Sequence, residues 1–425
     1  MLFLWLESRG DGVKRMSALP TKRASDASDN DHRPSVAIIS NGPAPYRITL
    51  HSRIVRELPG VRLYTVFTHS VSNAPWQPAL PDDIRPINFG EGERSADQAK
   101  PHRAWHEWKK AGRIIRWMRR EDIRLIVVGG YNDLGRLRLI HWCRRHGVPC
   151  MMFADSNVLG DRNSGLKRHV KRWIVQWVVR NCAGLMPCGT LGRQYFIKYG
   201  ADPNLIFYFP YEPDYGMMMT LSTGEIDSIR GEFGLLLGRK RVVFSGRLVK
   251  EKRADLLVDA FAKIADSRPD WDLLVIGDGP LRESLKSRLP TRLTGRVMWT
   301  GFLDDQRKIA GLYRLCDVLV LPSDFEPWAL VINEAAASGL AIVSSDVVGA
   351  AAELVRSGVN GELFRAGDLE SLVDKLRLVT DDANTLRLQQ GSADVLADWR
   401  RRGDPVKGLT DALHHFEVLH KVSVE

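Results

Sequence analysis

The sequence predicts an α/β protein with two doubly wound, Rossmann-like domains. Short apolar runs of strand length alternate with segments of helix length, and the alternation occurs twice, with a break between residues 211 and 238. The chain of 425 residues is also too long for one ordinary core. Since strands that alternate with helices form parallel sheets covered on both faces, we expect two such domains facing a central cleft.

The composition along the chain predicts five parts. Residues 17–34 are polar, so a disordered extension is expected at the N-terminus, and Met16 is an alternative start. The expected parts are the extension (1–34), an N-terminal Rossmann-like domain (35–212), an interdomain connection (213–238), a C-terminal Rossmann-like domain (239–384) and a helical segment that crosses back (385–425).

The expected strands of the first domain are apolar runs bounded by turn-forming residues. The segment 70–100 is rich in Pro and Gly and is predicted to be loop. The strands are expected at 35–40, 61–68, 123–130, 148–156, 182–189 and 205–210.

The second domain repeats the pattern from residue 241 onward. A final Arg-rich helix is expected near 385–402. The strands are expected at 241–246, 271–279, 296–301, 317–323 and 340–346, with helices between them.

Charge and cysteine content narrow the class of protein. The formal net charge of +10 favours an acidic partner, such as nucleic acid, anionic lipid or a phosphorylated substrate. Five cysteines without a CxxC pair indicate reduced thiols in the cytosol and no metal cluster. No apolar run approaches eighteen residues, and the first is too short for a signal peptide, so we expect a protein that is not integral to a membrane.

A basic loop follows the first strand of the second domain. Gly246 lets the backbone approach a ligand closely, and the cations Arg247 and Lys252 follow it. A guanidinium fork and an ammonium suit a diphosphate. The alternative is an ordinary solvated basic loop.

Two glutamates, Glu326 and Glu334, lie in the mostly apolar stretch 323–346. Pro327 fits the first turn of a helix, which would place Glu326 in the preceding loop and Glu334 two turns into the helix. The helix would then offer an anion site at the amides of Trp328, Ala329 and Leu330. The alternatives are a capping acid and a surface helix residue.

The order of these motifs is more specific than any one of them. It reads "GRLVKEK", "GDGP", "PSDFEPWALVINEA" and later "GLAIVS". This order resembles glycosyltransferase family 4, which comprises retaining nucleotide-sugar transferases of the GT-B fold. The resemblance is strong over 240–365 and moderate over 35–210, where "NGPAPYR" resembles the first loop of a polysaccharide-building branch.

The resemblance implies a role for each matching residue. Arg247 and Lys252 would neutralise the donor diphosphate, Glu326 would contact hydroxyls of the transferred sugar, and Glu334 would hold the ribose. Gly42 would be where the first domain approaches the donor. The base would lie near "TGFLDD" (300–305), which contains Gly301.

The sequence departs from the family pattern at two places. Many members carry Gly where Ala329 stands, and the extra methyl should be tolerated if the backbone is helical there. Many also carry a His after the strand that reads "MMFADSN" here, where this chain has Asp155. Asp155 is therefore either an acceptor-side residue or a turn-forming Asp.

The resemblance implies a retaining hexosyltransferase that needs no metal or other cofactor, because fixed cations would stabilise the leaving diphosphate. The C-terminal domain (239–384) would bind a nucleotide-sugar donor. The N-terminal domain (35–212) would lie on the acceptor side, and the acceptor would be a glycan or lipid-linked sugar of surface or exopolysaccharide synthesis. The alternatives are a nucleotide-sugar epimerase of the same fold and a non-catalytic nucleotide-sugar-binding subunit.

Two segments of the first domain, 102–124 and 166–181, mix Trp with Arg and Lys. This composition suits an anionic membrane surface, although ordinary domain helices would also fit it. No nucleic-acid recognition motif is present, so nucleic acid is not expected as a partner. The expected location is the cytoplasm, at the inner face of the membrane.

Overall fold

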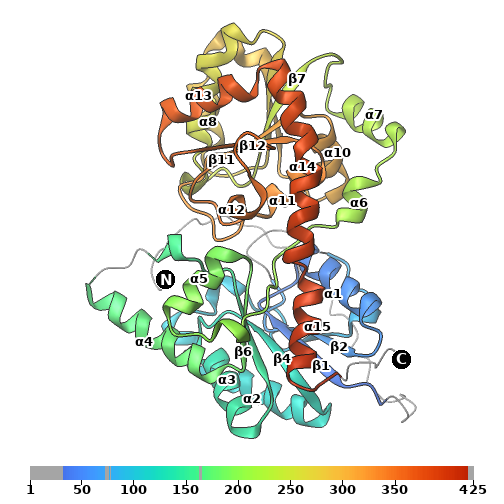
Figure 1. Cartoon of the computed structure of the whole chain (residues 1–425), viewed down its shortest axis with the longest axis vertical. Helices are drawn as coiled ribbons and strands as arrows, with labels where there is room; N and C mark the ends of the chain where they lie inside the picture. Colours follow the sequence, from blue (N-terminus) through green and yellow to red (C-terminus); the bar gives the residue numbers. More distant parts are fainter. Residues whose placement is uncertain (1–31, 72–75, 77, 162–164, 420–425) are drawn as a thin grey trace.

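The computed structural model describes residues 32–71, 76, 78–161 and 165–419 and contains two α/β domains joined in the middle (Figure 1). Nearly all of the expected N-terminal extension, 1–34, lies outside the described residues. Each domain is built on one six-stranded parallel sheet with helices around it, as the sequence predicts. No described helix has both the length and the apolar composition needed to cross a bilayer.

The sheet of the N-terminal domain has the order β3-β2-β1-β4-β5-β6. Its strands are β1 (Ser35–Ser40), β2 (Arg62–Phe67), β3 (Pro86–Asn88), β4 (Ile123–Gly129), β5 (Cys150–Ala154) and β6 (Gly184–Pro187). The accompanying helices are α1 (Pro45–Glu57), α2 (Ala104–Arg120), α3 (Leu134–His146), α4 (Gly165–Asn181) and α5 (Thr190–Lys198). The central strand β1 is buried at all six positions, because helices cover both faces of the sheet.

The C-terminal sheet repeats this topology in the order β12-β11-β10-β7-β8-β9. Its strands are β7 (Lys240–Ser245), β8 (Trp271–Ile276), β9 (Val297–Gly301), β10 (Val318–Leu321), β11 (Ala341–Ser345) and β12 (Gly361–Phe364). Its helices are α8 (Ala254–Ile264), α9 (Arg282–Arg288), α10 (Gln306–Arg314), α11 (Leu330–Ala337), α12 (Ala351–Leu354) and α13 (Leu369–Val379). In each sheet the strand order reverses beside the first strand, the point where such folds bind ligands.

Two expectations for the N-terminal domain are wrong. The segment 70–100 contains the edge strand β3, where an initial Pro is tolerated because that edge needs no amide donor. The segment 205–210 is not a strand of the sheet. It begins in a short 3₁₀ turn (Pro203–Leu205). The residues after the turn bond to β6 through the amides of Phe207 and Phe209, with one isolated parallel bridge from Ile206 to Leu185.

The chain passes between the domains twice. Helices α6 (Tyr215–Met219) and α7 (Thr223–Glu232) lie within the segment expected to connect the domains, yet they pack on α10 and α11 of the C-terminal domain. Helix α14 (Asp382–Arg402) runs along the C-terminal domain, and α15 (Pro405–His415) lies on the N-terminal domain (Figure 1). Leu409 and Leu413 of α15 are fully buried in a core cluster with residues of β1.

Candidate functional site

The carboxyl ends of the two sheets meet at the centre of the molecule. The Asn157 side-chain amide, after β5, donates to the Pro327 carbonyl oxygen at 2.9 Å. The backbone amide of Thr190, after β6, donates to the Glu353 carboxylate at 2.6 Å. Residues that follow strands of one domain therefore contact loops that follow strands of the other, as ligand-binding α/β folds require.

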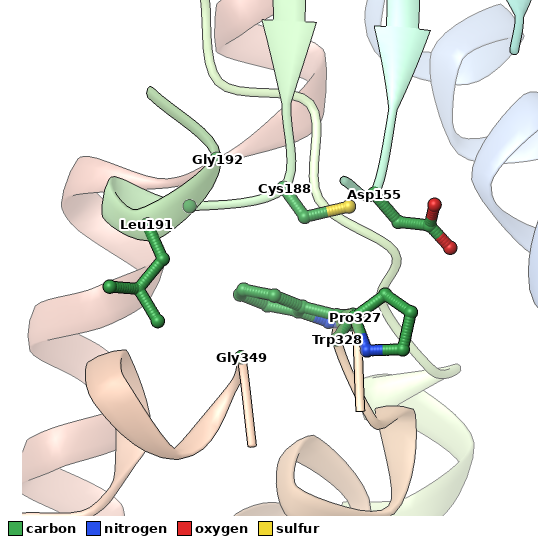
Figure 2. A pocket seen from close by; sticks show the side chains of 8 residues that line it. Asp155, Cys188, Leu191, Gly192, Pro327, Trp328 and Gly349 are labelled. Carbon is green, nitrogen blue, oxygen red and sulfur yellow. The ribbon is translucent and has the colours of Figure 1, made fainter. Parts of the chain in front are cut away.

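A small cavity of about 10 Å³ lies at this junction, which is room for about one water molecule. Figure 2 shows Pro327 and Trp328 of the C-terminal domain opposite Cys188 and Leu191 of the N-terminal domain, with Asp155 at its edge. The indole of Trp328 is 3% exposed and donates to the Tyr211 carbonyl oxygen at 3.1 Å. The sequence analysis names Trp328 for its backbone amide. The structure shows that its indole side chain also connects the two domains.

The backbone of the "GDGP" turn packs closely against the backbone of the basic loop. A Cβ atom at Gly277 would lie 2.0 Å from the Gly246 carbonyl oxygen, and one at Gly279 would lie 2.5 Å from the Leu248 carbonyl oxygen. The Leu248 amide donates to the Asp278 carbonyl oxygen at 2.9 Å. Because only Gly fits these contacts, the "GDGP" turn fixes the position of the "GRLVKEK" loop.

Lys252 and Glu326 form an ion pair, although 74 residues separate them. Lys252 ends a 3₁₀ turn (Lys250–Lys252) that follows β7, and Glu326 follows β10. The Ser323 hydroxyl also donates to Oε1 of Glu326, at 2.9 Å. Among the residues that the structure describes, no side chain binds the other carboxylate oxygen, so Oε2 can accept a hydrogen bond from a ligand.

Arg247 lies on the same loop with an exposed side chain. The structure therefore brings Lys252 to Glu326 and leaves the Arg247 guanidinium at the surface of the loop. The Lys252 ammonium is bound to a carboxylate, and the Arg247 side chain is exposed on the same loop. An ammonium carries three donors, so Lys252 can bind Glu326 and a phosphate oxygen together.

The loop before α11 differs from the expectation. Helix α11 begins at Leu330, so Pro327 is outside the helix and Glu334 lies one turn into it rather than two. Ala329 is the N-cap residue and has φ 81° and ψ 83°, in the left-handed region. The backbone at Ala329 is therefore not helical, and the methyl group there is strained. Leu330 is the first helical residue, at an end where amides lack intrahelical acceptors.

Glu334 is half-buried, one turn into α11. Its carboxylate accepts a hydrogen bond from the Tyr313 hydroxyl of α10 at 3.0 Å. Burial raises the pKa of Glu334 to about 7, and the bond from Tyr313 opposes this rise. A half-buried carboxylate with one neutral partner can accept hydrogen bonds from a hydroxylated ligand.

The N-terminal domain contributes Arg47, which the sequence reasoning did not single out although it ends the quoted "NGPAPYR" motif. Its guanidinium donates to the Gly42 carbonyl oxygen at 2.8 Å and lies 5.3 Å from the ring centre of Tyr46. Burial raises the pKa of Asp155, and the nearby Arg47 charge opposes this rise. Gly42, Arg47 and Asp155 thus belong to one neighbourhood at the ends of β1 and β5.

Gly301 ends β9 with φ 75°, and its carbonyl oxygen accepts from the Gly277 amide at 2.9 Å. It therefore lies beside the "GDGP" turn, on the far side from Lys252. A side chain there would also crowd Arg282, whose guanidinium lies 3.3 Å from the position of a Cβ.

One group in the described part of the chain offers metal-ligand atoms: His69, Glu93 and Glu107. The Lys110 ammonium lies among them, 2.9 Å from Glu93 and Glu107 and 3.3 Å from the His69 Nε2 atom. Burial alone would raise the pKa of Glu93, yet Lys110 and His106 hold it at about 2. The lysine already satisfies these carboxylates, so the group is suited to stabilising the domain rather than to holding a metal.

The sequence and the fold were compared with those of known proteins. Residues 225–393 match the family described as Glycosyl transferases group 1. The complex of HepE from Anabaena with UDP and glucose superposes with a TM-score of 0.66 at 18% identity, covering 91% of this chain and all of that chain. The fold is therefore GT-B, the two-domain fold of glycosyltransferases, as the sequence predicts.

Two sequence relatives each match less than half of the chain. The lipopolysaccharide core biosynthesis mannosyltransferase LpsB of Rhizobium meliloti is 35% identical over 172 residues, 39% of this chain and 47% of that protein. The D-inositol 3-phosphate glycosyltransferase of Nocardia farcinica is 32% identical over 203 residues, 46% of this chain and 44% of that protein. The chain thus spans less than half the length of these relatives. The residues that match the group 1 glycosyl transferase family, 225–393, include Lys252, Glu326 and Glu334.

Proposed function

We propose that the chain is a retaining, metal-independent glycosyltransferase that moves a hexose-type sugar from a nucleotide diphosphate donor to a glycan or lipid-linked acceptor. The observation that carries the proposal is the pair of Lys252 and Glu326 beside the N-terminus of α11. It combines a cation for the leaving diphosphate with a carboxylate oxygen for the sugar.

In this reaction the bond between the anomeric carbon and the diphosphate oxygen breaks, and its electron pair stays on the diphosphate. Lys252, the exposed Arg247 and the first amides of α11 stabilise that charge. The acceptor hydroxyl attacks on the face that the diphosphate leaves, and its proton passes to a diphosphate oxygen. The anomeric configuration is therefore retained.

The two glutamates have different tasks. Glu326 orients the sugar ring through Oε2 while Lys252 and Ser323 hold Oε1. Glu334, one turn into α11 and bonded to Tyr313, accepts hydrogen bonds from the ribose. Ribose does not change during transfer, so its contacts act equally in the ground state and the transition state.

Steady-state kinetics on two variants test this division of roles. Glu326→Ala should lower kcat on the order of a hundredfold or more while the free nucleoside diphosphate still binds. Glu334→Ala should mainly raise the donor KM, by the loss of a charged hydrogen bond worth roughly 1.5–3 kcal/mol. Normal turnover by Glu326→Ala, with calorimetric diphosphate binding as the control, would refute the catalytic assignment.

Metal independence has its own test. Transfer should persist in EDTA, because Arg247 and Lys252 supply the positive charge that a divalent ion would otherwise supply. Complete loss of transfer on chelation, restored by Mn²⁺ or Mg²⁺, would contradict this part of the proposal.

We further propose that the enzyme works at the inner face of an anionic membrane. Helices α2, α3 and α4 together carry fifteen Lys or Arg and one acidic residue, the buried Glu107. The whole chain has 61 basic and 51 acidic residues, so the remainder holds 46 and 50. The basic excess of the protein is thus confined to these three helices, and binding to anionic vesicles should weaken as salt rises.

A product assay separates the proposed transferase from an epimerase or a binding subunit of the same fold. A transferase forms a glycoside and free nucleoside diphosphate, whereas an epimerase returns an isomer of the nucleotide-sugar. A binding subunit would bind the donor and release neither product. Donors can be found by thermal shift, since a ligand at a hundred times its Kd adds about 2.7 kcal/mol of stability.

A further inference from the structure

The outer face of the N-terminal domain carries an apolar groove within its basic helices. Helices α2 and α3 pack side by side, as do α3 and α4 (Figure 1). These helices hold six of the 12 tryptophans of the chain. The groove has a volume of about 260 Å³, and its lining includes Trp108, Leu134, Leu137, Trp173, Ile174 and Trp177.

The apolar side chains at this groove lie unusually open to solvent. Trp173 is 69% exposed, Leu134 46% and Trp108 37%, and Trp105 on the same helix as Trp108 is 65% exposed. Large exposed apolar patches on soluble proteins mark interaction sites. The groove exceeds the roughly 150 Å³ of an apolar cavity that holds a benzene molecule, so it can take a length of hydrocarbon chain.

Cations stand beside the aromatic rings rather than beside acids. The Arg138 guanidinium lies 4.6 Å from the ring centre of Trp108, and the Lys109 ammonium lies 5.6 Å from that of Trp105. Arg116, Arg168 and Arg172 are exposed on α2 and α4. An apolar floor with cations around it matches an amphiphile that has a hydrocarbon tail and an anionic head.

The positive charge around the groove favours some ligands over others. A second copy of the chain would bring the same basic face against this one, and like charges would repel. A nucleic acid would satisfy the cations, but the Leu134, Leu137 and Ile174 side chains offer no hydrogen bond to a base edge. The hydrocarbon tail of an anionic lipid satisfies both the groove and the cations.

We propose that the groove between α2, α3 and α4 binds an acyl chain of an anionic phospholipid, so that the N-terminal domain docks on the bilayer by insertion as well as by charge. This deepens the membrane role proposed above. It rests on that role for its setting and is independent of the transfer chemistry in the other domain.

Binding of short-chain phosphatidylglycerol below its micellar concentration tests the proposal, with calorimetry and tryptophan emission as readouts. The full chain should bind the lipid with saturation and a blue shift, and at least tenfold more tightly than the glycerophosphoglycerol head group alone. Trp173→Gln and Leu134→Gln should each weaken lipid binding about tenfold. Leu386→Gln is the matched control, because Leu386 is 61% exposed on α14 of the other domain.

Three results would overturn the proposal. They are equal binding of the head group and the lipid, wild-type lipid binding by Trp173→Gln, and saturation of the groove by a single-stranded oligonucleotide. Circular dichroism checks that the variants fold, and nucleotide binding is measured in parallel. Loss of lipid binding with intact nucleotide binding concerns the groove alone, whereas loss of glycosyl transfer with intact lipid binding concerns the proposed enzyme.

Discussion

At the residue scale, the carboxylates of Glu326, before α11, and Glu334, within α11, are stabilised in different ways. Glu326 is compensated by Lys252 and Ser323, so its charge costs little. Within the described part of the chain, the Glu334 carboxylate has the neutral Tyr313 hydroxyl as its one hydrogen-bond partner, and burial raises its pKa to about 7. Burial of the Glu334 carboxylate therefore lowers the free energy of unfolding at neutral pH and above. Such perturbed pKa values are common at functional sites.

The stability of the protein should fall with pH because of Glu334. Its pKa rises from 4.5 to about 7 on folding. Between these values the folded chain holds a proton that the unfolded chain has released, so the free energy of unfolding decreases as pH rises, by up to about 3 kcal/mol. Glu334→Gln removes this titration, and its melting temperature should exceed that of the wild type at pH 8 and match it near pH 5.

The control for this prediction is Glu283→Gln, because the Glu283 side chain is 81% exposed. That substitution should leave the melting temperature within about a degree at both pH values, since exposed ion pairs contribute little. A stability difference for Glu334→Gln that is the same at pH 5 and pH 8 would contradict the raised pKa.

Ala329 is a second residue that lowers the stability of the fold, because its left-handed backbone conformation is strained for a residue with a Cβ atom. Ala329→Gly should raise the free energy of unfolding by about 0.5–1.5 kcal/mol, the relieved strain being partly offset by the freer unfolded chain. Urea denaturation measures the gain. Ala337→Gly in the last turn of the same helix is the control and should lower stability by about 1 kcal/mol. A loss at both positions would show that Ala329 is not strained.

At the element scale, α15 belongs to the N-terminal core although it ends the described chain. Leu409 is fully buried among residues of β1 and β4. A Cβ at Gly408 would lie 1.8 Å from the Tyr208 carbonyl oxygen, so the helix touches the backbone of the segment it covers. Helix α15 therefore packs in the same core as β1, although more than 360 residues separate them.

Leu409→Ala should therefore destabilise the N-terminal domain by about 2–5 kcal/mol, the usual cost of a large cavity. Hydrogen exchange should show faster exchange of the β1 amides (35–40), far away in sequence. Leu386→Ala, at an exposed position of α14, should change stability by less than about 0.5 kcal/mol. Unchanged protection of β1 in Leu409→Ala would mean that α15 is not part of that core.

At the scale of the whole molecule, Trp328 connects the domains. It packs on Trp399 of α14 with 5.6 Å between ring centres and donates to the Tyr211 carbonyl oxygen. Its ring lies 2.9 Å from the position that a Cβ at Gly189 would take. One side chain thus touches both domains and the helix that returns between them.

Trp328→Ala should lower the free energy of unfolding by about 3–5 kcal/mol and broaden the distance distribution seen by small-angle scattering. Trp328→Phe keeps an aromatic ring and loses the N–H donor, so it should cost only about 1–2 kcal/mol. If the two variants behave alike in both measurements, the indole ring does not hold the domains together.

The sequence alone determined the fold class, because the alternation of strand-length and helix-length segments depends only on which residues are apolar. The strand 35–40 was predicted with its observed bounds, and the signal for Lys252, Glu326 and Glu334 lay in motif order. The sequence did not give β3 or the start of α11. Three residues form an edge strand only when β2 is there to pair with them, and the non-helical angles of Ala329 depend on the surrounding loops.

Tertiary structure decided what distant residues do together. No spacing rule joins Lys252 to Glu326, because a parallel sheet places neighbouring strand ends side by side whatever the length of chain between them. None joins Trp328 to Tyr211 either, because these residues follow strands of two different sheets. The same holds for the groove on the N-terminal domain. The sequence shows basic helices with tryptophans, but only the packing of α2, α3 and α4 determines which rings are buried and which line an open apolar surface.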